Sequence, residues 1–98
     1  MRVRFTPEAL RSIREKRAWW EANRDKAPRL FVEELASVIE KVRNDADTER
    51  HQFGAAGGRV IWRLLMPKTR HHVYYRRNDS DVEVLVVWNA VGKAEPDL

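Results

Sequence analysis

Polar and apolar positions at the start of the chain follow a strand pattern and then a helix pattern. Residues 2–5 alternate in polarity, as a short β-strand does, and Thr6 and Pro7 then supply an N-cap oxygen and a preset first helical residue. Side chains able to cover a core follow at helical spacing, at Leu10, Ile13, Arg17 and Trp20. The pattern predicts a helix that ends at about Arg24.

A second helical pattern starts at Pro28. Its apolar residues stand at positions i, i+4, i+7, i+8 and i+11, namely Phe31, Leu35, Val38, Ile39 and Val42. This spacing predicts an amphipathic helix that ends at about Arg43. Because a few residues join the two predicted helices, we expect them to form an antiparallel hairpin.

The second half of the chain has a strand pattern. Residues 44–58 mix charges with three glycines, and we expect them to form a long, mobile loop. RVIWRLLM, HHVYYR and VEVLVVWN then predict three strands, and the four-residue turns PKTR and NDSD join antiparallel neighbours. A short tail, residues 90–98, follows. We expect an α+β fold with the N-terminal strand, the hairpin packed on one face of an antiparallel sheet, and a three-strand meander at its end.

The turn lengths set the register of the meander, because each pairing must place apolar residues on a common face. The predicted pairs are Met66 with His71, Leu64 with Val73, Trp62 with Tyr75, Tyr75 with Val84, Val73 with Val86, and His71 with Trp88. The face that receives the helices should then carry Val60, Trp62, Leu64, Val73, Tyr75, Val82, Val84, Val86 and Trp88. The opposite, open face should carry Ile61, Arg63, Leu65, His72, Tyr74, Arg76, Glu83, Leu85 and Val87.

The stretch TRHHVYYRRNDSD is dense in side chains that ligate metals, move protons or hold phosphate. Adjacent strand residues point to opposite faces, so His71 and His72 cannot act together. A metal site needs three or four convergent ligands, and with His51 as the one further histidine we expect no metal. The open face keeps four candidate catalytic residues: Arg63, His72, Tyr74 and Arg76. Their alternative role is a solvated sheet face stabilised by cross-strand pairs such as Arg76 with Glu83.

Two adjacent tryptophans lie on the first predicted helix, and a helix cannot turn both to the same side. We expect Trp20 to lie in the core. Trp19 then either flanks the seam of the hairpin or anchors a partner, since tryptophan is enriched among the residues that dominate binding energy.

Composition narrows the class of protein. The 98 residues have 43% apolar content, which suits one domain over residues 1–98. The longest apolar run, VLVVW, is far shorter than the roughly 18 residues of a membrane span, and no signal-like segment opens the chain, so we expect a cytoplasmic protein. Without cysteine, disulfide scaffolds and thiol catalysis are excluded. The net charge of +4, with 14 arginines among 19 basic residues, favours an anionic partner.

Two segments carry a resemblance to a known family. WWEANRDKAPRLFVEEL and then RVIWRLLMPKTRHHVYYRRNDSDVEVLVVWNAVGKAEPDL resemble the ParE-like branch of the RelE/ParE superfamily, the toxins of type II toxin-antitoxin modules. The order and spacing of the segments match over nearly the whole chain. The resemblance implies a RelE/ParE-like fold and a toxin that a cognate antitoxin neutralises.

What the resemblance implies about mechanism depends on particular residues. RelE-like members cut messenger RNA on the ribosome with basic residues of the sheet, an arginine of the third strand, and an arginine with a tyrosine or histidine after the last strand. Here Arg63 matches a basic sheet position, but His72 takes the place of the third-strand arginine. Lys93 is the one cation after Trp88, where neither arginine, tyrosine nor histidine occurs. ParE-like members lack the nuclease set and are similar to poisons of DNA gyrase.

Three functions therefore stay open. We rank a non-catalytic inhibitor of DNA gyrase first, a ribosome-dependent mRNA endoribonuclease second, and an inactive relative that still binds an antitoxin third. The resemblance implies an acidic, partly disordered antitoxin as partner and no cofactor. The residues expected to contact a partner are Trp19, Arg24, Arg63, His72, Tyr74, Arg76 and Lys93.

Overall fold

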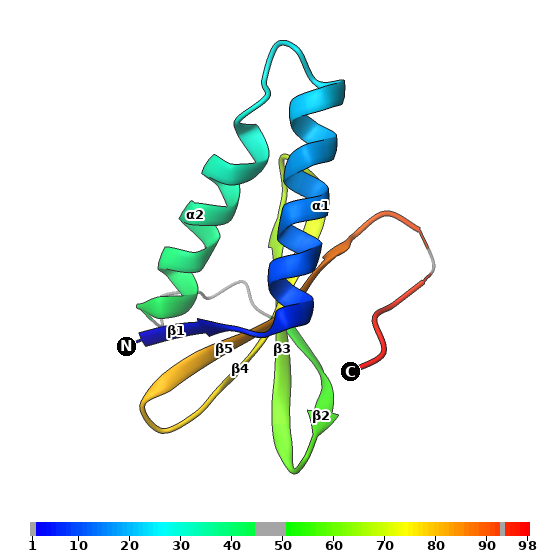
Figure 1. Ribbon diagram of the computed structural model, residues 1–98. Helices are drawn as coiled ribbons and strands as arrows, with labels where there is room; N and C mark the ends of the chain where they lie inside the picture. The colour runs from blue at the N-terminus through cyan, green and yellow to red at the C-terminus, as the bar shows by residue number, and fades with distance from the viewer. Residues whose placement is uncertain (1, 45–50, 93) are drawn as a thin grey trace.

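Two helices lie on one side of a β-sheet (Figure 1). The computed structural model describes residues 2–44, 51–92 and 94–98. Within these ranges the helices are α1 (Pro7–Asn23) and α2 (Leu30–Arg43). The strands are β1 (Arg2–Phe5), β2 (His51–Ala56), β3 (Arg59–Met66), β4 (His71–Arg77) and β5 (Asp81–Asn89). The predicted α+β class, both predicted helices and the four predicted strands are confirmed.

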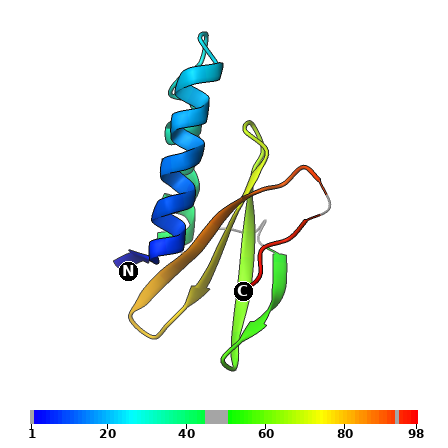
Figure 2. The same cartoon turned by 45° about the vertical axis from the view of Figure 1, so that its right-hand side comes forward.

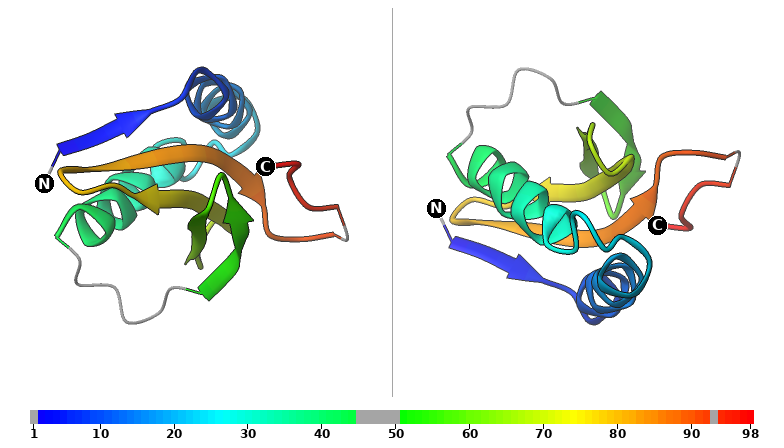
Figure 3. Two further views of the ribbon diagram at one scale, coloured as in Figure 1. Left: turned by 90° about the horizontal axis from the view of Figure 1, so that it is seen from below. Right: turned by 90° about the horizontal axis from the view of Figure 1, so that it is seen from above.

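The sheet is mixed, and this corrects the antiparallel sheet predicted from the sequence. Among the described residues the strand order is β1-β5-β4-β3-β2. β1 runs parallel to β5, with Val3 opposite Val82, while the pairs from β5 to β2 are antiparallel. Parallel pairing needs a long connection, which the helices and the intervening strands provide. Figure 3 shows both helices on the same side of this sheet.

Part of the predicted loop is a strand. Residues 51–56 form β2 at the sheet edge, so within the described residues the meander has four strands instead of three. Gly57 and Gly58 turn the chain into β3 with φ angles of 59° and 77°, which glycine adopts without strain. β2 lacks the β-branched residues typical of strands, and this is why its composition indicated a loop. The remainder of that predicted loop, residues 45–50, lies outside the described residues.

The predicted register holds across the first turn of the meander and fails in part across the second. All three predicted pairs between β3 and β4 are observed. Tyr75 lies opposite Val84 as predicted, but the next pair skips Leu85, an extra residue on β5. This β-bulge moves the rest of β5 by one position. The observed pairs beyond it are Tyr74 with Val86, Val73 with Val87, His72 with Trp88 and His71 with Asn89.

The bulge exchanges side chains between the faces of the sheet. Val87 lies on the helix side, where Val86 was predicted, and Val86 and Trp88 lie on the opposite face. The buried core under the helices comprises Ala9, Phe31, Leu35, Val38, Val42, Leu64, Met66, Val73, Tyr75, Val82, Val84 and Val87. A smaller cluster on the opposite side, called the outer face below, comprises Ile61, Tyr74, Leu85 and Val86, with Phe53 and Trp88 against it. Val60, predicted on the helix side, is exposed.

α1 is tied to the sheet through its first half. Thr6 Oγ1 accepts the Ala9 N–H at 3.0 Å as the N-cap and donates to the Leu85 carbonyl at 2.7 Å. Ser12 Oγ accepts the Val87 N–H at 3.0 Å, so Thr6 and Ser12 satisfy backbone groups at the bulge residue Leu85 and just after it. Among the residues of α1, all of which are described, Ala9 alone is buried. The second half of the helix diverges from the sheet (Figure 2).

α2 contributes more of the core than α1 does. Its buried apolar residues lie on one face of the helix, as their spacing predicted: Phe31, Leu35, Val38 and Val42. Arg77 Nη2 donates to the carbonyl of Val42 at 2.7 Å, which satisfies a backbone group at the helix C-terminus. Within the described residues, no helix is long and apolar enough to cross a membrane.

Candidate functional site

The structure places three of the four candidate catalytic residues together on the outer face. Arg63, His72 and Tyr74 line a cavity of about 250 Å³ between the sheet and the C-terminal tail. Arg76 is not among the residues that line it. Lys93, the one predicted contact from the tail, lies outside the described residues.

Tyr74 is part of the packing of the outer face. Its side chain is 1% exposed and meets the Phe53 ring edge to face, with centroids 4.8 Å apart. The prediction that Tyr74 lies on the face away from the helices is confirmed. Phe53 lies on β2, a strand that the sequence analysis did not predict. The packing of Phe53 against Tyr74 was therefore not predicted either. Tyr74 therefore presents only a small part of its surface to the cavity that it lines.

Both candidate arginines of the outer face, Arg63 and Arg76, have carboxylate partners. Arg76 donates through Nε and Nη2 to Glu83 Oε1 at 2.8 and 2.7 Å, as the predicted cross-strand pair implied. Arg63 Nη1 lies 3.5 Å from Glu95 Oε2, and its guanidinium lies over the Phe53 ring at 5.8 Å. Trp88 Nε1 donates to the Ala94 carbonyl at 3.1 Å, so the tail returns to the outer face. Arg63 and Arg76 therefore each have a carboxylate partner within the chain.

His72 is the remaining candidate on the outer face. Its ring lies 6.0 Å from the Tyr74 ring and is partly buried. Burial lowers the pKa of His72, and the positive charges of Arg63 and His51 lower it further. The imidazole is therefore neutral near pH 7 and can accept a proton.

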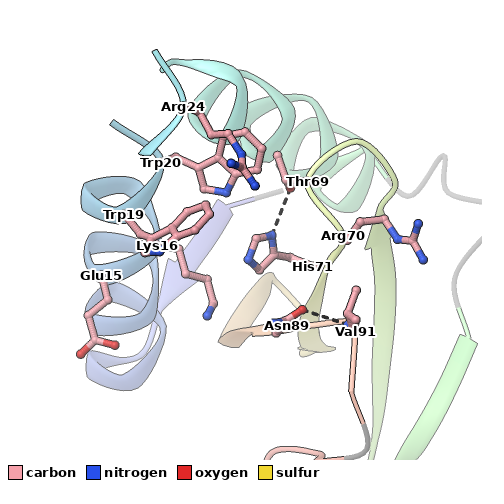
Figure 4. Close-up of a pocket in the computed structure, with 10 residues that line it drawn as sticks. All are labelled: Glu15, Lys16, Trp19, Trp20, Arg24, Thr69, Arg70, His71, Asn89 and Val91. Carbon is pink, nitrogen blue, oxygen red and sulfur yellow. Dashed lines mark hydrogen bonds between the residues drawn. The ribbon is translucent and has the colours of Figure 1, made fainter. Parts of the chain in front are cut away.

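Trp19 and Arg24 lie in a different place, a cleft of about 510 Å³ between the second half of α1 and the strands β4 and β5 (Figure 4). We call it the α1 cleft. It is lined by Glu15, Lys16, Trp19, Trp20, Arg24, Thr69, Arg70, His71, Asn89 and Val91. Trp19 and Arg24, two of the seven predicted partner contacts, therefore lie apart from the predicted contacts on the outer face. Lys16 and His71 were not predicted as functional residues.

Aromatic and cationic side chains form one wall of the α1 cleft. Trp19 and Trp20 meet edge to face with centroids 5.9 Å apart, and Arg24 lies over both rings, at 5.0 and 5.5 Å. Trp20 packs against the core, as predicted, and Trp19 is 48% exposed. Lys16 is partly buried beside them, and desolvation lowers its pKa against the opposing effect of the Glu15 carboxylate.

A chain of hydrogen bonds fixes His71 at the floor of the α1 cleft. The buried Glu34 carboxylate accepts the N–H groups of Lys68 and Thr69 at 2.7 and 2.8 Å and the Thr69 hydroxyl at 2.8 Å. Because that hydroxyl proton goes to Glu34, Thr69 Oγ1 accepts from His71 Nδ1 at 3.1 Å. Nδ1 therefore carries the proton of the neutral ring, and Nε2 keeps a lone pair.

His71 stays neutral over a wide pH range. Burial lowers its pKa to about 4, the nearby Lys16 ammonium lowers it too, and Glu34 opposes both. Its ring also meets Phe31 edge to face at 5.2 Å. No group of three or more histidine, aspartate or glutamate side chains within the described residues could hold a metal ion.

No family model matches the chain, and neither does any curated protein. What the two places can do therefore follows from their geometry. The outer face offers the imidazoles of His72 and His51, with Arg63 and Arg76 paired to carboxylates and Tyr74 buried. The α1 cleft offers cations, a half-exposed indole and a histidine of fixed tautomer.

Proposed function

We propose that this chain is the toxin component of a type II toxin-antitoxin module and has the RelE/ParE-like fold. We further propose that it inhibits DNA gyrase by binding, without chemistry of its own. The resemblance of the two sequence segments supports membership. The pairing of Arg63 with Glu95 and of Arg76 with Glu83 supports binding over catalysis, and this observation carries the proposal.

A ribonuclease would need more than the outer face supplies. Cleavage of RNA through the 2'-hydroxyl requires an acid and a base within hydrogen-bond reach, and donors aimed at the charge that develops on the phosphate. Tyr74 is buried, and Arg63 and Arg76 already bind Glu95 and Glu83. Among the described residues, the side chains left for proton transfer on this face are His72 and the exposed His51, which lies opposite Arg63.

The expected partner is an acidic antitoxin, partly disordered when free. A chain with a net charge of +4 attracts such a partner over a distance, and this attraction mainly speeds encounter. A toxin of this kind meets its antitoxin and DNA gyrase in the cytoplasm. The proposal therefore includes a cytoplasmic location.

Two parallel reactions test the proposal. Purified protein is added to a DNA gyrase supercoiling reaction and, separately, to a reconstituted translation reaction. We expect loss of supercoiling with accumulation of cleaved DNA, and unchanged messenger RNA. His72→Ala should behave as the wild type does in both reactions. Full supercoiling at a large excess of folded protein would reject gyrase as the target.

A ribosome-dependent endoribonuclease remains the second candidate, because Arg63 and His72 share the 250 Å³ cavity on the outer face. If Glu95 were displaced by RNA, Arg63 would be released toward a phosphate. Messenger RNA cleavage in the translation reaction, lost in His72→Ala, would favour this function. A protein inert in both reactions that still binds the neighbouring gene product would be an inactive relative.

A further inference from the structure

Lys16 and Arg24 of the α1 cleft differ from Arg63 and Arg76 of the outer face because they form no ion pair with a carboxylate of the described residues. Neither Lys16 nor Arg24 forms an ion pair with any residue in the described ranges 2–44, 51–92 and 94–98. Glu15, the one acid among the lining residues of that part of the chain, points away from the cleft (Figure 4). The Arg70 side chain also turns away from α1. Lys16 and Arg24 are thus available to an anion.

The same cleft has a flat aromatic surface. Trp19 is half exposed although it lines the cleft, and the guanidinium of Arg24 lies over its ring at 5.0 Å. A planar ligand gains from stacking on an indole, and every nucleobase has such a face. A planar group with a negative charge attached would use the indole and the cations together.

The floor and rim of the cleft add hydrogen-bond groups of both kinds. His71 Nε2 is an acceptor, because Nδ1 carries the proton, and it lies on the side of the ring that faces α1 (Figure 4). Asn89 Oδ1 accepts the Val91 N–H at 2.9 Å, which leaves the Asn89 amide protons as donors. An ionised carboxylate or a phosphodiester offers only acceptors and cannot donate to His71. The edge of a nucleobase offers both donors and acceptors.

We propose that the α1 cleft binds a nucleotide, with the base on the Trp19 ring, the base edge toward His71 and Asn89, and the phosphate held by Lys16 and Arg24. The volume of about 510 Å³ falls in the range of small-ligand sites, roughly 300 to 1,000 Å³. A free mononucleotide and the end of a single strand of nucleic acid supply the same chemistry. An acidic peptide matches the cations but leaves the His71 acceptor without a side-chain donor. The site is independent of the proposed toxin activity.

Calorimetric titration of the intact protein tests the proposal with four probes at about 0.15 M salt. The probes are AMP, adenosine, inorganic phosphate and a single-stranded hexamer of deoxyadenosine. We expect AMP to bind saturably and at least about tenfold more tightly than adenosine or phosphate. Adenosine lacks the phosphate that the cations would hold, and inorganic phosphate lacks the base that would stack on Trp19. A hexamer that binds much more tightly than AMP identifies a strand end as the ligand. Equal affinities identify a free nucleotide.

Two variants place the ligand in the cleft. Trp19→Ala removes the stacking surface and should weaken AMP binding about tenfold or more. Lys16→Gln removes a charge-assisted contact and should weaken it about tenfold. Arg14→Gln is the matched control, because it removes the same charge from an exposed site of α1 outside the cleft. It should change affinity less than about twofold at this salt concentration.

Three results would overturn the proposal. The first is no saturable binding of AMP or of the hexamer to protein whose thermal unfolding is normal. The second is AMP binding that Trp19→Ala and Lys16→Gln leave unchanged, which would place the ligand elsewhere. The third is binding of a polyglutamate peptide, weakened by Lys16→Gln, by a protein that ignores AMP, which would assign the cleft to a protein partner.

Discussion

The outer face and the α1 cleft contain similar side chains, but they differ in whether their cations form ion pairs. Each has cations, a histidine and aromatic rings. On the outer face Arg63 and Arg76 form ion pairs with Glu95 and Glu83, whereas in the cleft Lys16 and Arg24 form none with the described residues. Charges that are paired inside the chain contribute to its stability, and charges left unpaired beside a cavity are available to a ligand. A count of cations along the sequence does not separate these cases.

The difference arises from how each place is built. Neighbouring strands set Arg76 directly opposite Glu83, so a pair forms wherever the register brings opposite charges together. α1 is held to β5 near its N-terminus, by Thr6 and Ser12, and its second half diverges from the sheet. The space beside the second half is lined by α1 on one side and by the sheet on the other. No strand pairing supplies a partner for Lys16 there.

The largest effect expected from this comparison is at Tyr74. If the outer face is a packed structural cluster, Tyr74→Ala should lower the free energy of unfolding by about 3–5 kcal/mol, as truncation of a buried aromatic does. Leu65→Ala, at an exposed position of β3, is the control and should cost under about 1 kcal/mol. Chemical denaturation measures both. Equal, small costs would mean that the cluster around Tyr74 is loose.

The next effect concerns the support of the cleft floor. Glu34→Ala removes the acceptor of three hydrogen bonds from residues 68 and 69 and should cost about 2–3 kcal/mol, because buried donors are left unsatisfied. Glu33→Ala, at an exposed position of the same helix, should cost less than about 0.5 kcal/mol. Thermal and urea unfolding compare the two variants. A cost for Glu34→Ala no larger than that of the control would show that the loop after β3 does not depend on this carboxylate.

The pH dependence of stability tests the state of His71. Its pKa is about 4 in the folded protein and about 6.5 when unfolded, so between these values the unfolded chain binds more protons. The contribution of neutral His71 to the free energy of unfolding should be fully present above pH 6.5 and should be lost as the pH falls toward 4. We expect the loss to be about 1–2 kcal/mol after allowance for partial hydration of the ring. Urea unfolding of the wild type and of His71→Asn measures it. The variant should lose this part of the dependence, and identical pH profiles would contradict the assignment.

The smallest effect is the pairing energy of Arg76 with Glu83. A double-mutant cycle with Arg76→Gln and Glu83→Gln should give a coupling of about 0.5–1 kcal/mol, typical of a partly exposed pair. The same cycle on Arg17 and Glu21 of α1, an exposed pair, should give about 0.3–0.5 kcal/mol. A coupling of zero for Arg76 with Glu83 would remove the argument that pairing inside the chain holds this arginine.

The sequence predicts the parts of this fold that depend on local pattern. Helical spacing located α1 and α2, and the four-residue turn PKTR set every observed pair of β3 with β4. The bulge at Leu85 was not predicted, because Leu85 stands in a continuous run of β-branched and apolar residues. Nothing in the composition or the length of that run marks one residue as unpaired. One inserted residue then moved Val86, Val87 and Trp88 to faces opposite to those expected.

The candidate site was predicted less well than the fold. The pairing of Arg76 with Glu83 followed from register, and the packing of Tyr74 depended on β2, whose glycine and alanine content hid it. The α1 cleft depends on the angle at which a helix leaves a sheet, which no periodicity encodes. A signal was present in Lys16, which lies four residues before the predicted core residue Trp20 on one helix face. Arg17, which the sequence placed on the core-facing stripe, is exposed and pairs with Glu21, and Lys16 lies beside the cleft instead.

The most direct test of the account is to map the ends of messenger RNA in translation reactions that contain this protein. If it acts by binding, wild type and His72→Ala will give the same uncut RNA at protein concentrations that stop DNA gyrase. The contradicting result is a set of cuts placed by codon position, produced by the wild type and abolished in His72→Ala at unchanged thermal stability. That outcome would make His72 a catalytic residue and the outer face an active site.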